Sequence, residues 1–165
     1  MFDNQGFVAE EIGHFYIVIS VAYLMGNMMA KRLVNRVSVE TVLGVGFLFF
    51  GLGGAGMVLS AYLFGYHPYA VILPMGVVVF GNGFLFPTGS AGALAAVPSA
   101  FSGMASGLMG AFQFVAAALC ISWVGDLCEG EALSLSIFIF AIVLVGLVNF
   151  LLIIWRSRRA SYMIT

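Results

Sequence analysis

The amino-acid sequence predicts an all-α protein, a polytopic transmembrane helix bundle with five spans. Its composition is 62% hydrophobic and only 8% charged, whereas soluble domains carry about 25% charged residues. No Asp, Glu, Lys or Arg occurs from Thr41 to Gly125. The charges fall in short clusters between or beside apolar runs, where loops would meet water. Together these three observations exclude a soluble globular protein.

The first two spans follow from clear boundaries. Residues 12–30 form an apolar run of about the 20 residues that a helix needs to cross the hydrocarbon core, and Lys31 and Arg32 close it. A second run covers residues 41–61 and ends at the segment YLFGYHPY. The proline of that segment favours a break, and its tyrosines favour the membrane–water interface.

The remaining apolar sequence needs one more cut, because residues 70–125 are too long for a single crossing. Pro98 and Ser99 mark a weaker break within the segment ALAAVPSA. The predicted spans are therefore residues 70–92, 100–122 and 133–155. We expect residues 1–165 to form a single membrane domain.

The charge distribution predicts the orientation, because cytoplasmic loops carry the excess of Lys and Arg. If the loop from Lys31 to Glu40 is inside, five crossings place the N-terminus outside and the C-terminus, with Arg156, Arg158 and Arg159, in the cytoplasm. All six basic residues are then inside, and of the seven acids only Glu40 is inside with them. This predicts a multi-pass protein of the cell (inner) membrane.

An odd number of spans with an external N-terminus is typical of a membrane protein that lacks its front half. A short acidic tail can also cross a membrane unaided, so a self-contained five-span protein is the alternative. The sequence therefore leaves two interpretations open, a partial transporter and a complete small membrane protein.

Small residues predict where helices approach each other closely. We define the small-residue stripe as four positions of the fourth span: Gly103, Ser106, Gly107 and Gly110. The second span carries a comparable run, GLGGAG, at residues 51–56. Packing within the bundle is the favoured role of both, and a dimer interface is the alternative.

The third span contains Pro74 and Pro87. A proline inside a spanning helix removes a backbone hydrogen bond and bends the helix. Bent or broken helices flank the substrate path of many transporters. Kinking without a role in transport is the alternative interpretation.

Polar side chains within the apolar runs are few. Asn82 and Gln113 lie near the middle of the third and fourth spans, and aromatic neighbours such as Phe84 and Phe112 would suit the wall of an apolar cavity. A mid-membrane amide bonds across helices or faces a cavity. We therefore treat these four residues as candidates for substrate binding, with interhelical bonding as the alternative for the two amides.

Other chemistry is not indicated. The spans lack deep acids for a proton relay and the His, Asp, Glu or Ser/Lys sets that a membrane enzyme would need. Cys120 and Cys128 match no disulfide framework or paired metal motif. The basic residues are too few for binding nucleic acid. We expect no enzymatic activity, no metal and no cofactor.

Two segments resemble major facilitator transporters. GNMMAKRLVNRVSVE, from Gly26 to Glu40 with Lys31, Arg32 and Arg36, looks like the cytoplasmic loop between the eighth and ninth helices of that family. GNGFLFPTGSAGALAAVPSAFSGMASGLMGAFQF, from Gly81 to Phe114, resembles helices ten and eleven of the Bcr/CflA-type drug-resistance branch. The positions that fit that pattern are Pro87, Gly103, Ser106, Gly107 and Gln113.

The resemblance covers nearly the whole chain, as helices eight to twelve of a twelve-helix fold. It implies a secondary transporter that exports small amphipathic compounds by alternating access coupled to protons. The implied partners are the lipid bilayer, the substrate and an N-terminal transporter half. Helix seven and that half, where related antiporters commonly carry their proton-titrating acids, have no counterpart here. A structural or accessory protein without transport activity is the alternative.

Overall fold

The computed structural model describes residues 9–64, 68–128 and 132–162, and every long element in them is an α-helix. The five helices are α1 (Ala9–Val34), α2 (Val39–Phe64), α3 (Pro68–Ala95), α4 (Ser102–Cys128) and α5 (Ala132–Tyr162), with a short 3₁₀ turn, Ser99–Phe101, before α4. All five are long and apolar enough to cross a membrane. The predicted all-helical fold with five spans is therefore confirmed.

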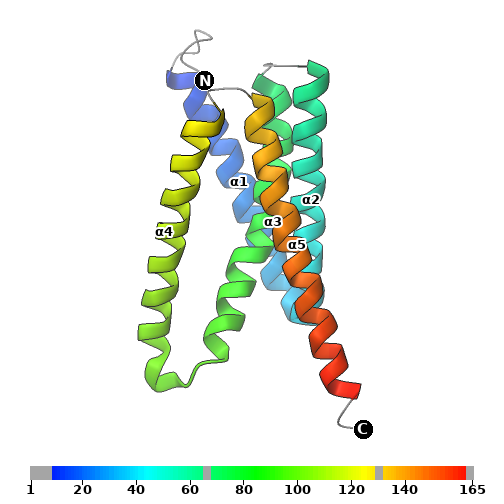
Figure 1. Cartoon of the computed structure of the whole chain (residues 1–165), viewed down its shortest axis with the longest axis vertical. Helices are drawn as coiled ribbons and strands as arrows, with labels where there is room; N and C mark the ends of the chain where they lie inside the picture. Colours follow the sequence, from blue (N-terminus) through cyan, green and yellow to red (C-terminus); the bar gives the residue numbers. More distant parts are fainter. Residues whose placement is uncertain (1–8, 65–67, 129–131, 163–165) are drawn as a thin grey trace.

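The helices run alternately up and down, so α1 begins at one end of the molecule and α5 ends at the other (Figure 1). α3 packs against both α1 and α2, and α5 packs along α2. α4 stands apart from this four-helix group and meets it near its two ends. Four of the predicted spans lie within single helices, and the remaining one, residues 100–122, begins in the 3₁₀ turn Ser99–Phe101 and continues in α4.

α1 and α3 cross at a contact between two glycines. A Cβ atom added to Gly83 of α3 would lie 2.6 Å from the carbonyl oxygen of Tyr23 and 2.9 Å from the backbone nitrogen of Asn27 on α1. A Cβ on Gly26 would collide with the carbonyl oxygen of Phe80. Only a hydrogen atom fits at both positions. Such close packing of small residues holds membrane helices together, because the hydrophobic effect does not drive helix association within lipid.

A second glycine contact joins α2 and α3. A Cβ on Gly53 would lie 2.5 Å from the backbone nitrogen of Val78, and one on Gly81 would lie 2.8 Å from the carbonyl oxygen of Gly46. Gly54, next in the α2 run, faces Phe140 of α5. The GLGGAG run therefore packs within the bundle, between α3 and α5.

A buried cluster lies where α1, α2 and α3 meet. Ala30, Val42 and Phe84, one from each helix, are at most 2% exposed. The Phe84 ring stands 5.4 Å from the Phe80 ring, and the Phe80 ring stands 5.0 Å from the Phe49 ring in an edge-to-face arrangement. Aromatic pairs in this geometry add favourable contact energy to the burial. This cluster fixes α1 and α2 against the middle of α3.

Charges at the α1–α2 turn suit the helix ends that carry them. Lys31 and Arg32 lie in the last turn of α1, and Glu40 lies in the first turn of α2. The backbone amide of Thr41 donates a hydrogen bond of 3.4 Å to the Ser38 hydroxyl, which caps α2. A helix dipole favours positive charge at its C-terminus and negative charge at its N-terminus. Glu40, the one acid on the predicted cytoplasmic side, therefore lies where a negative charge stabilises the start of α2.

Candidate functional site

α4 packs against almost nothing in the described part of the chain. Within the span Ser99–Val124, the most apolar window has no buried residue. A Cβ added to Gly103, Gly107 or Gly110 would meet no atom within 4 Å among the described residues. The Ser106 hydroxyl donates its 2.9 Å hydrogen bond to the carbonyl of Gly103 on its own helix. The packing role of the small-residue stripe stays a prediction, because the described residues supply no neighbour for it.

Gln113 and Phe112 share this exposure. The Phe112 side chain is 68% exposed, and Gln113 belongs to the exposed class. No hydrogen-bond partner for the Gln113 amide is present among the described residues. Moving a primary amide from water into hydrocarbon without a hydrogen-bond partner costs on the order of 4–8 kcal/mol. The position of Gln113 therefore calls for a polar neighbour that the described five helices do not provide.

The two candidates on α3 have different surroundings. Asn82 is half-buried, whereas Phe84 is 1% exposed and belongs to the core with Ala30 and Val42. α3 and α4 approach each other near their connecting turn and diverge beyond it (Figure 1). The structure therefore does not bring Asn82 and Phe84 together with Gln113 and Phe112. The assignment of all four to one substrate cavity stays a prediction.

Pro74 and Pro87 both lie inside α3. Pro74 is held against α2, where a Cβ on Gly56 would touch its ring carbons at 3.4 Å. Beyond Pro87, the last turns of α3 lean away from α1 and α2 toward the start of α4 (Figure 1). A proline lacks the backbone N–H that would bond the carbonyl four residues earlier, so Pro87 leaves the Gly83 carbonyl without that partner.

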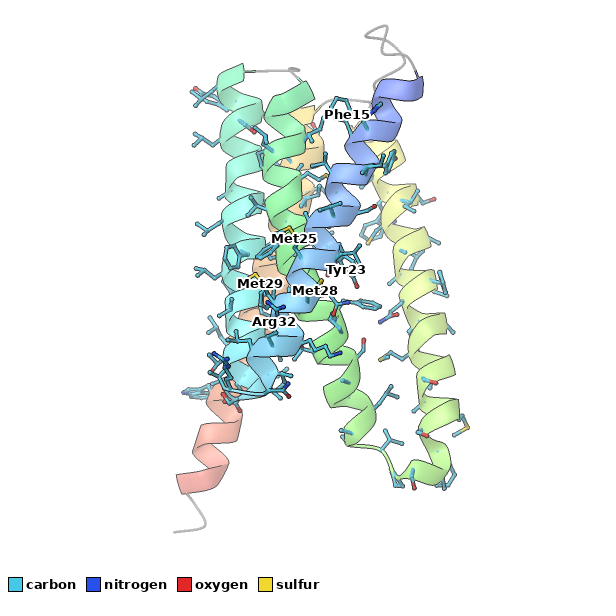
Figure 2. The ribbon with its side chains drawn as sticks, turned by 180° about the vertical axis from the view of Figure 1, so that it is seen from behind. Phe15, Tyr23, Met25, Met28, Met29 and Arg32 are labelled. Atoms are coloured by element: carbon cyan, nitrogen blue, oxygen red, sulfur yellow. The ribbon has the colours of Figure 1, made fainter. Side chains whose placement is uncertain are left out.

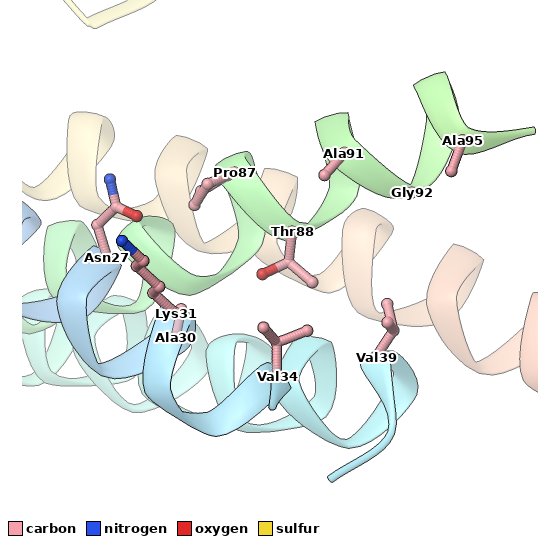
Figure 3. Close-up of a pocket in the computed structure, with 10 residues that line it drawn as sticks. All are labelled: Asn27, Ala30, Lys31, Val34, Val39, Pro87, Thr88, Ala91, Gly92 and Ala95. Atoms are coloured by element: carbon pink, nitrogen blue, oxygen red, sulfur yellow. The ribbon is translucent and has the colours of Figure 1, made fainter. Parts of the chain in front are cut away.

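Where α3 leans away, a cavity of about 410 Å³ opens between α1, the start of α2 and the end of α3. Its polar lining consists of Asn27 and Lys31 on α1 and Thr88 on α3, and Figure 3 shows the three side chains on facing sides of the opening. The other lining residues are small or apolar: Ala30, Val34, Val39, Pro87, Ala91, Gly92 and Ala95. We call this space the α1–α3 cavity.

Sequence reasoning missed this cavity. Asn27 and Lys31 are four residues apart and therefore share one helix face, and Thr88 directly follows a helix-bending proline. Those signals were present, but only the tertiary structure shows that the two faces meet. Within the described residues, Lys31 forms no ion pair and neither Asn27 nor Thr88 has a side-chain hydrogen bond. Their polar groups are free to bind a ligand.

The other basic residues of the predicted cytoplasmic loop lie beside the cavity. Arg32 and Arg36 line a separate open depression of about 600 Å³ with Met29, Leu33 and Asn35. Figure 2 shows Arg32 near the end of α1, below the exposed methionines of that helix. Lys31, Arg32 and Arg36 therefore present three positive charges at one end of the bundle.

The described residues contain no group of three or more His, Cys, Asp and Glu side chains that would suit a metal ion. Cys120 lies exposed on α4 with its thiol free. Cys128 ends α4, and its side chain lies outside the described residues. Comparison with protein-family models, with curated proteins and with solved structures finds no match to this chain.

Proposed function

We propose that this chain is part of a multi-pass membrane transporter and that further spans pack against α4 in the working assembly. The observation that carries the proposal is the exposure of α4, which has no buried residue in its spanning window. Among the described residues, no helix packs against Gln113 or the small-residue stripe of this span. Lipid offers no hydrogen bond to the amide and packs poorly against small residues, so we infer that another helix covers this face.

The shape of α3 supports a transporter over a rigid scaffold. Two prolines interrupt its backbone ladder, and a cavity opens where its last turns leave α1 and α2. Transporters commonly build their paths beside helices that are broken in this way. The half-buried Asn82 lies between the two prolines, and its amide is our candidate on α3 for contact with substrate.

The class of substrate comes from the resemblance of Gly81–Phe114 to Bcr/CflA-type transporters. On that basis the assembly exports small amphipathic compounds by alternating access, coupled to proton entry through an N-terminal transporter half that pairs with this chain. Placement of Lys31, Arg32 and Arg36 in the cytoplasm gives an external N-terminus and a cytoplasmic C-terminus in the cell (inner) membrane.

The first test maps the neighbours of α4. A photo-crosslinking amino acid is placed at Gln113, and the full chain is expressed with an N-terminal half of a transporter of this branch. The matched control carries the crosslinker at Leu48, an exposed position of α2. We expect a covalent product with the N-terminal half from position 113 and lipid adducts alone from position 48.

The second test measures transport. Cells that express both halves should expel a fluorescent cationic dye, and cells that express either half alone should retain it. Gln113→Ala should change the range of dyes expelled while the amount of assembled protein is unchanged. A chain that crosslinks to no helix at position 113 and never restores efflux with any partner half would rule out the proposal in favour of an accessory protein.

A further inference from the structure

The α1–α3 cavity has the dimensions and lining of a small-molecule site. Its volume of about 410 Å³ lies within the range of roughly 300–1,000 Å³ that is typical of ligand pockets, and its walls are mostly apolar with a few polar groups. One wall carries the only charged side chain among its lining residues, Lys31. A ligand that fits must therefore combine an apolar body with a group that an ammonium attracts.

The polar groups of the cavity line both of its sides, two on α1 and one on α3. Asn27 and Lys31 project from successive turns of α1, and the Thr88 hydroxyl points toward them from α3 (Figure 3). An ammonium, an amide and a hydroxyl supply several hydrogen-bond donors, which suits a phosphate or carboxylate group. No carboxylate belongs to the cavity lining, so nothing there competes for the Lys31 charge.

The location of the cavity points to the source of that anion. Lys31 lies one turn before the end of α1, at the level where a spanning helix leaves the hydrocarbon. Arg32 and Arg36 add positive charge at the same end of the bundle. Basic pockets between spans on the cytoplasmic side attract the anionic lipids of that leaflet, by about 1 kcal/mol for each Lys or Arg near the surface.

We propose that the α1–α3 cavity binds an anionic phospholipid of the cytoplasmic leaflet. Lys31, Asn27 and Thr88 bind its phosphate group, and an acyl chain lies along Ala91 and Ala95 of α3. The proposal rests on the orientation proposed above, which puts this end of the bundle in the cytoplasm, but not on transport activity, because the lining residues belong to α1, α2 and α3.

The test uses the full chain purified from vesicles that contain equal amounts of phosphatidylglycerol and phosphatidylcholine, with retained lipid counted by native mass spectrometry. We expect retention of phosphatidylglycerol over phosphatidylcholine. Lys31→Gln should reduce that retention about fivefold, the factor that corresponds to one lost lysine contact. The matched control is Arg36→Gln, which removes the same charge from the same end of the bundle outside the cavity lining and should reduce retention clearly less than Lys31→Gln does.

Two further measurements test whether the lipid binds in the cavity or to the charged surface in general, and whether the ligand is a lipid or a soluble anion. Ala91→Trp fills the cavity without changing its charge and should abolish retention of phosphatidylglycerol. Helix content, measured by circular dichroism, checks that each variant is folded. Equal losses for Lys31→Gln and Arg36→Gln, or full retention by Ala91→Trp, would overturn the proposal. Displacement of the lipid by millimolar inorganic phosphate would overturn it as well, since a soluble anion would then be the ligand.

Discussion

Single atoms decide how closely the helices of this protein approach. At Gly83, the space that a methyl group would occupy is taken by the backbone of α1, with the Tyr23 carbonyl oxygen 2.6 Å from the Cβ position. The atoms in the way are main-chain atoms, which cannot rotate aside as a flexible side chain would. A single added carbon must therefore shift the backbones of α1 and α3 at this contact.

We expect Gly83→Ala to lower the free energy of unfolding by about 1–3 kcal/mol, the usual cost of overpacking a tight contact. The matched control is Gly76→Ala in the same helix, where nothing lies within 4 Å of the Cβ position and alanine should be neutral or stabilising through helix propensity. Unfolding in mixed micelles, followed by circular dichroism, measures both. Equal stability of the two variants would contradict the close contact.

The two phenylalanines proposed for substrate binding provide a second comparison. Phe84 is 1% exposed in the core, and Phe112 is 68% exposed on α4. Phe84→Ala should lower the free energy of unfolding by about 3 kcal/mol through lost contacts and a residual cavity. Phe112→Ala should change it by less than about 0.5 kcal/mol. The same unfolding assay decides, and a neutral Phe84→Ala would show that this ring has no structural role.

At the scale of elements, α3 organises the bundle. It contacts α1 through Gly83, contacts α2 through Gly81 and carries both internal prolines. The remaining long helices have simpler relations, since α5 packs along α2 and α4 packs along no helix in the described chain. The conformation of α3 beyond Pro87 therefore determines how wide the α1–α3 cavity is.

Pro87→Ala should narrow that cavity, because alanine restores the N–H that can bond the Gly83 carbonyl and straightens the helix. Spin labels at Val34 and Ala95, on opposite walls, would report this by pulsed electron resonance after Cys120 and Cys128 are replaced by serine. We expect a shorter mean distance than in the wild type. Pro74→Ala, far from this end of α3, should leave the distance unchanged, and an unchanged distance in Pro87→Ala would contradict the prediction.

The number and type of elements were predictable because hydrophobic length and loop charge are local properties of the sequence. The GLGGAG run was also a readable packing signal, and its glycines contact α3 and α5. The contacts of Gly26 and Gly83 were not predictable, since they depend on which helix faces which. For the same reason the α1–α3 cavity was missed, although Asn27, Lys31 and Thr88 were visible in the sequence.

At the scale of the whole molecule, the charged residues that the structure describes, other than Glu40, are sorted by end. Lys31, Arg32 and Arg36 lie near the end of the bundle at which α5 finishes (Figure 1), and the arginines 156, 158 and 159 belong to the last turns of that helix. Glu10 and Glu11 belong to the first turn of α1, at the opposite end. The antiparallel course of the five helices thus agrees with the separation that the sequence predicts.

This separation predicts the outcome of thiol labelling in intact cells. With the native cysteines replaced by serine, Tyr62→Cys at the acidic end should react with a membrane-impermeant maleimide, because the proposed orientation places it outside. Asn35→Cys, in the turn between α1 and α2, should react only after the membrane is permeabilised. Labelling of both positions from the same side would reject five crossings in this orientation.

The position of the last glycine contact on α3 has a mechanical consequence. Gly83 clamps the helix to its neighbour, and Pro87 follows one turn later, so the helix is held on one side of this point and released on the other. α3 can therefore bend at Pro87, with the segment before it held against α1 and the segment after it able to move. Movement of the last turns of α3 would widen the protein at its basic end, while the contacts of α3 with α1 and α2 before Gly83 stay as they are.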